Sequence, residues 1–152
     1  MSTTAPSAHA PVASSASFLA RRPVWQVSYL AGLAASVVVE IWGLAARAIG
    51  VPMRVAGLGS HDATPISVGM FAMGTMVVIF WFTFAVILMA RFSKNPKRIY
   101  LRTALPLLAL SLAVPATAAD TAISTKVTLA AAHLIAGAII IPVVARRLAG
   151  PR

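Results

Sequence analysis

The chain has 152 residues, of which 59% are hydrophobic, 11% are charged and none is cysteine. A soluble domain of this length would have to expose much of its apolar surface to water, so the composition indicates an integral membrane protein. The lack of cysteine excludes disulfides, thiolate metal sites and cysteine nucleophiles. The net charge of +10 has to be explained within a membrane protein, because no soluble basic face for nucleic acid is expected.

Residues 1–21 are mostly serine, threonine, alanine and proline, with few large apolar side chains. This composition predicts a disordered tail. Arg21 and Arg22 precede an apolar run, as they would in a secretory or twin-arginine signal. That run is too long, contains Glu40 and lacks a small-residue cleavage site, so we interpret it as a retained first helix.

Four long runs almost free of charge follow the tail, and each is able to cross a membrane as a helix. A hydrocarbon core of roughly 30 Å needs about 20 helical residues at about 1.5 Å per residue. The runs lack the alternation of apolar and polar residues that spanning strands require. We therefore expect an all-α, four-helix membrane bundle over residues 22–148, followed by a short tail at 149–152. The predicted transmembrane helices cover residues 24–46, 66–90, 101–119 and 127–145.

Lysines and arginines beside these runs predict the orientation, because cationic flanks are retained in the cytoplasm. The loop between the second and third runs holds Arg91, Lys94, Lys97, Arg98 and Arg102. Further cations precede the first run and follow the fourth, whereas the other two loops hold only Arg47, Arg54 and Lys126. Both termini and the basic loop are therefore expected to be cytoplasmic, with the protein in the plasma membrane. The same loop has the charge to recruit anionic lipid headgroups or an acidic partner, although the topology rule alone predicts it.

The first predicted helix carries small and polar residues along one face. Counted in steps of three and four, this stripe holds Ser28, Gly32, Ser36, Glu40, Gly43 and Arg47. Small residues at this spacing let helix backbones approach closely in lipid, where dispersion and hydrogen bonds hold helices together. Glu40 is therefore expected to face a neighbouring helix and not the lipid.

Between the first two predicted helices, His61 and Asp62 are adjacent in a loop. We interpret this loop as a solvated turn, with the second helix starting near Thr64 and Pro65. No two histidines or carboxylates in the chain have ligand spacing on one helix face, so neither a metal nor a cofactor is expected.

Polar residues of the other predicted helices fall near the level of Glu40. His133, with Gly137 one turn along on the same face, lies as far inside the fourth helix as Glu40 lies inside the first. Ser111 and Thr75 fall at a similar depth. We therefore predict a polar tier across the outer half of the bundle, in which Glu40 meets His133.

Three roles are open for this tier. It is structural if its members hydrogen-bond one another or water and fix the helix register. It is a proton or ion site if Glu40 and His133 titrate along a transmembrane path. It is a binding site if the outer half of the bundle opens into a cavity for a lipid or a small molecule.

Two prolines are expected to kink the third predicted helix. Pro115 cannot donate the hydrogen bond that would reach the Ser111 carbonyl, which places one kink beside the polar tier. Pro106 is expected to act in the same way nearer the cytoplasmic end. Most prolines in membrane helices bend them without further purpose, whereas in transporters such breaks create sites.

Three segments of the second half carry a family resemblance: "NPKRIY" in the basic loop, "LSLAVP" in the third helix, and "KVTLAAAHLIAGAIIIP" in the fourth. With His133-Leu134 and Pro142 in place, residues 22–148 resemble a family of small four-helix membrane proteins, domain of unknown function 6069, common in actinobacteria. This chain has Ala132 where the family often has methionine before the histidine. The resemblance implies the fold and the membrane location, and it implies no chemistry.

Two functional hypotheses remain, and neither is an enzyme, because no nucleophile and base pair, phosphate loop or metal cluster is recognisable. The first is a structural or accessory membrane protein in which the polar tier fixes the bundle or engages a partner helix. The second is a small proton-linked carrier or channel that uses Glu40 and His133. The expected partners are the lipid bilayer and either a second copy or another membrane protein, and not nucleic acid.

Overall fold

The computed structural model describes residues 21–57 and 59–150. Four long helical segments in this part of the chain are long and apolar enough to cross a membrane, so the protein is a multi-pass membrane protein. These are α2 (Val24–Ala48), α3 (Met70–Phe92), α4 (Pro96–Ser111) continued by α5 (Ala113–Thr117), and α6 (Ile123–Ala149). The tail predicted to be disordered lies, apart from Arg21, outside the described residues.

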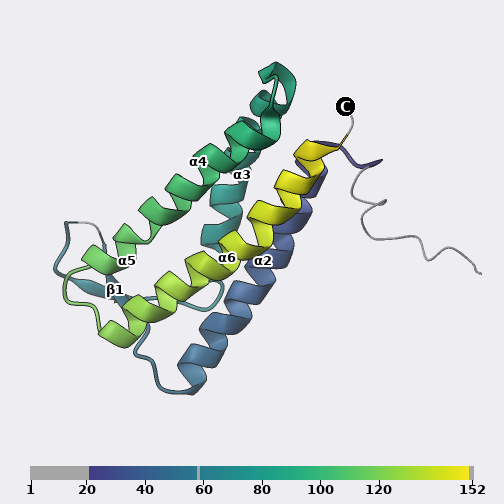
Figure 1. Ribbon diagram of the computed structural model, residues 1–152. Helices are drawn as coiled ribbons and strands as arrows, with labels where there is room; N and C mark the ends of the chain where they lie inside the picture. Colours follow the sequence, from purple (N-terminus) through teal and green to yellow (C-terminus); the bar gives the residue numbers. More distant parts are fainter. Residues whose placement is uncertain (1–20, 58, 151–152) are drawn as a thin grey trace, which may run out of the picture.

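In Figure 1, α4 and α6 lie in front, with α3 behind and between them and α2 behind α6. α2 packs along both α3 and α6, and α4 packs along α6. Consecutive helices α3 and α4 touch only lightly. We call the end with the α3–α4 loop, the start of α2 and the end of α6 the basic end, and the opposite end, with the two strands, the hairpin end.

The ends of α2 and α4 have local causes. After α2, Gly50 adopts φ +89°, its N–H donates to the carbonyl of Arg47, and that of Val51 donates to the carbonyl of Ala46. This left-handed glycine turn satisfies the last carbonyls and ends the helix. α4 begins five residues before the predicted start at 101, because Pro96 is suited to a first helical turn.

The two prolines of the third span differ in effect. α4 continues through Pro106 to Ser111, and the helix is then interrupted at Leu112 before α5 begins. The interruption lies where Pro115, which has no N–H, would have donated to the Ser111 carbonyl.

A short hairpin replaces the solvated turn that we expected before the second span. β1 (Arg54–Ala56) pairs antiparallel with β2 (Ala63–Pro65), with Val55 opposite Thr64. The expected helix start near Thr64 is wrong, because Pro65 disfavours helical geometry in the residue before it. The helix begins at Met70, after Gly69 has turned the chain with φ +90°.

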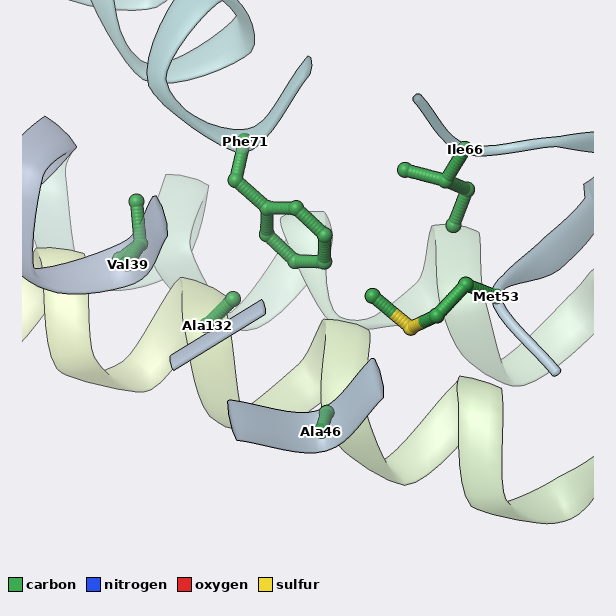
Figure 2. Close-up of a cluster of buried hydrophobic side chains, with 6 residues drawn as sticks. All are labelled: Val39, Ala46, Met53, Ile66, Phe71 and Ala132. Carbon is green, nitrogen blue, oxygen red and sulfur yellow. The ribbon is translucent and has the colours of Figure 1, made fainter. Parts of the chain in front are cut away.

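Two apolar clusters fill the interior. At the hairpin end, Figure 2 shows Phe71, Met53 and Ile66 converging above the helices that carry Ala46 and Ala132. At the basic end, α3, α4 and α6 meet around the fully buried Tyr100 and Val86. At one end the hairpin and its flanks therefore pack onto α2, α3 and α6, whereas at the other end the helices themselves close the core.

Close helix contacts are made by glycine, while large apolar side chains point outward. A Cβ on Gly32 would lie 2.7 Å from Ile79, one on Gly43 would lie 2.9 Å from Phe71, and one on Gly137 would lie 2.6 Å from Leu108. Large side chains such as Trp81 are exposed on the outside of the protein. This distribution suits a lipid environment, in which helices associate by close backbone approach.

Gly32→Ala is expected to destabilise the protein by about 1–3 kcal/mol, because the new methyl group overlaps the stiff, buried Ile79. The matched control is Gly74→Ala, since a Cβ on Gly74 in α3 meets no atom within 4 Å and alanine favours the helix. Unfolding in mixed detergent and SDS micelles, followed by tryptophan fluorescence, measures both. Equal stability of the two variants would contradict this packing.

Candidate functional site

The small and polar stripe of α2 lies against α3 in antiparallel register. The Ser28 and Thr83 hydroxyls are 2.8 Å apart and buried. Four residues along α2 and four back along α3, Gly32 meets Ile79. The pairing continues toward the hairpin end, where the stripe reaches the segment that leads into α3. We call this segment, residues 66–72, the α3 entry.

Glu40 binds the backbone of the α3 entry with both carboxylate oxygens. The Gly69 N–H donates to Oε1 at 2.7 Å, and the Ala72 N–H donates to Oε2 at 3.1 Å. The side chain is half-buried. Glu40 therefore serves as the cap of a helix that starts 30 residues further along the chain.

The chemistry of this contact follows from what α3 lacks. The first N–H groups of any helix have no partner within the helix, and this end of the helix carries a partial positive charge. α3 has no acidic residue in its first turn and no side-chain cap of its own. The carboxylate satisfies two of these donors, and the donors compensate its negative charge inside an apolar protein.

Arg47 holds the same segment two turns further along α2. Its Nη2 donates to the carbonyl oxygen of Ile66, while its Nη1 is buried without a hydrogen-bond partner. Arg47 therefore binds a carbonyl before the turn at Gly69, and Glu40 binds the backbone N–H groups at and after this turn. Together Glu40 and Arg47 fix where the α3 entry lies on α2.

The predicted meeting of Glu40 with His133 is wrong. The Nδ1 of His133 lies 2.7 Å from the Leu129 carbonyl oxygen of its own helix. Because a carbonyl only accepts, Nδ1 carries the proton in this hydrogen bond. The partner of Glu40 is the second span and not the fourth, because the loop after α2 brings backbone N–H groups to its level.

The remaining members of the predicted tier bind their own helices. The hydroxyls of Ser36, Thr75 and Ser111 donate to the carbonyls of Leu33, Phe71 and Leu108, at 2.8, 2.8 and 2.7 Å. Each polar group is therefore satisfied one turn back along its own helix. The structure does not join them into one network. Within the described part of the chain, no three histidine or carboxylate side chains are placed to hold a metal ion.

Three contacts between separate segments were not predicted from the sequence. Thr83 is the buried partner of Ser28, and the Trp42 indole N–H donates to the Thr128 carbonyl at 3.0 Å, which joins α2 to α6. A tryptophan inside a span signals such a contact, since its N–H needs an acceptor. The third joins two loops at the hairpin end, where His61 Nδ1 lies 3.0 Å from Asp120 Oδ2.

Three of the five cations of the predicted basic loop line a pocket, and two do not. Lys94, Lys97 and Arg98 line one pocket at the basic end. Arg91 lies 6.0 Å from the ring centre of Phe92, and Arg102 is exposed on α4.

Residues 19–150 match the family of unknown function DUF6069. The chain belongs to this family. The match spans all four long helical segments, the hairpin, Glu40 and His133, so the α2–α3 contact lies within the family's own domain. Neither a curated protein nor a solved structure matches the chain.

Replacing Glu40 is expected to destabilise the protein in a graded way. Glu40→Ala leaves two backbone N–H groups without an acceptor, at about 1–3 kcal/mol for each. Glu40→Gln keeps one acceptor oxygen and loses less. Asp62→Asn is the matched control, because it also removes one carboxylate, from an exposed loop position. The same unfolding titration ranks the variants, and Glu40→Gln as stable as Asp62→Asn would refute the capping role.

Proposed function

We propose that this DUF6069 protein is a structural or accessory membrane protein in which Glu40 locks α3 onto α2. In this proposal it spans the plasma membrane four times, with both termini and the basic loop in the cytoplasm. Its partners are the bilayer lipids and a transmembrane helix of a second copy or of another membrane protein. It catalyses no reaction and needs no cofactor.

The observation that carries the proposal is the engagement of both Glu40 oxygens by backbone N–H groups of the α3 entry. A proton-carrying carboxylate exchanges partners during transport, whereas these partners are backbone N–H groups at the start of a helix, which have no acceptor of their own within it. Other members of the predicted tier support the same interpretation, since the hydroxyls of Ser36 and Thr75 and the Nδ1 of His133 hydrogen-bond within their own helices.

The charge distribution supports the orientation. Arg91, Lys94, Lys97 and Arg98 lie at the basic end, and Arg146 and Arg147 occupy the last turn of α6 at the same end. Asp62 and Asp120 lie in loops at the hairpin end. Cationic flanks are retained in the cytoplasm, so the basic end is assigned to the cytoplasm.

Single cysteines test the orientation in an otherwise cysteine-free chain. In intact cells a membrane-impermeant maleimide is expected to label Gly57→Cys at the hairpin end and to leave Asn95→Cys unlabelled. Both positions are exposed. After permeabilisation both are expected to react, which controls for reactivity. Labelling of Asn95→Cys alone in intact cells would reverse the assigned topology.

Proteoliposomes test the structural role against the carrier hypothesis. Under an imposed potential, vesicles with the wild-type protein are expected to take up protons no faster than empty vesicles, as measured with an internal pH-sensitive dye. Glu40→Gln and His133→Ala are expected to give the same background rate. A wild-type flux that both variants abolish would overturn the proposal.

Purification from the native membrane tests the expected partner. Purified in mild detergent from its native membrane, the protein is expected to bring a stoichiometric membrane protein or to run as a homo-oligomer. A monomer without a protein partner would count against an accessory role.

A further inference from the structure

We infer that the basic end carries a binding site for the headgroup of an anionic phospholipid. The site is a pocket of about 510 Å³ between the α3–α4 loop, the first turns of α4 and the end of α6. The inference needs only the membrane location of the chain. It is independent of the role proposed for Glu40, which lies at the other end.

Three cations line the pocket and no acidic side chain balances them. Lys94 lies in the loop, and Lys97 and Arg98 lie in the first turn of α4. The whole chain has only three acidic residues, and all of them lie toward the hairpin end: Glu40, Asp62 and Asp120. Like charges gathered in this way repel one another, and an anion in the pocket relieves that repulsion.

The lining favours a lipid over a free phosphate ion. Leu148, only 8% exposed, belongs to the apolar cluster around Tyr100, and the half-buried Leu101 stands on α4 beside it. An inorganic ion gains nothing from these side chains. A phospholipid brings a phosphate for the cations and, linked to it through the glycerol, apolar acyl chains for the leucines.

The position along the membrane normal fits the same ligand. The pocket lies where one spanning helix ends at Phe92 and the next begins at Pro96. Spans of this length end at the boundary between hydrocarbon and headgroups, which is where lipid phosphates lie. Basic pockets between transmembrane helices at this depth bind anionic headgroups.

Lipid titration followed by native mass spectrometry tests the site on delipidated full-length protein. The probes are phosphatidylglycerol, zwitterionic phosphatidylcholine of the same chain length, and inorganic phosphate. The pocket variant is Lys94→Gln with Lys97→Gln. The matched control is Arg102→Gln with Arg146→Gln, which removes the same charge from exposed positions that do not line the pocket.

The wild-type protein is expected to retain phosphatidylglycerol about tenfold more tightly than phosphatidylcholine. The pocket variant is expected to lose about tenfold in affinity for phosphatidylglycerol, while the control variant binds as the wild type does. Unfolding midpoints measured without lipid verify that both variants fold. Lys97→Gln alone, with a smaller expected loss, replaces the pocket variant if that variant does not fold.

Three results would overturn the inference. Equal losses in the two double variants would show a diffuse charge effect and no pocket. Equal affinity for the two lipids would remove the headgroup preference. Displacement of phosphatidylglycerol by inorganic phosphate at equal concentration would assign the pocket to a free phosphate ion.

Discussion

The contact between Glu40 and the start of α3 solves two problems at once. A carboxylate inside an apolar bundle needs donors, and the first turn of a helix inside a membrane needs acceptors. Each group meets the need of the other, with two hydrogen bonds to Gly69 and Ala72. This contact shares one antiparallel register with the pairing of Ser28 with Thr83 and of Gly32 with Ile79, and in the proposed role of Glu40 it holds α3 at that level.

The rest of the architecture follows from that register. α3 begins at the level of Glu40, whereas α2 continues to Ala48 at the hairpin end. The chain between them therefore has to return along the bundle, and it includes the hairpin. Met53 and Ile66, which flank this hairpin, complete the apolar cluster with Phe71 at the start of α3. At the opposite end no such segment is needed, because α3, α4 and α6 meet directly around Tyr100.

The two ends of the molecule differ in charge as well as in packing. The three carboxylates lie toward the hairpin end, where Glu40 is bound to backbone and Asp120 is paired with His61. At the basic end, Lys94, Lys97 and Arg98 share one pocket, and its lining contains no acidic side chain. Two of the three acidic side chains are therefore bound within the protein at one end, whereas three cations gather around a pocket at the other.

The sequence by itself determined the four membrane spans and the family. An apolar run must be helical in lipid, because its backbone groups have no other partner there. The small and polar stripe of α2 also indicated that Glu40 faces a neighbouring helix, and α3 is that neighbour.

Only the tertiary structure decided which groups Glu40 binds. Equal depth along two helices suggested His133, but depth does not say which helix faces which, and it ignores backbone donors. The deciding feature was the loop between α2 and α3. Its strands have three residues each, too short for any pattern of alternation to reveal, and its turn at Gly69 delivers N–H groups where side-chain spacing predicted a histidine. Hydropathy locates helices, whereas the contacts between them depend on loop geometry that hydropathy does not contain.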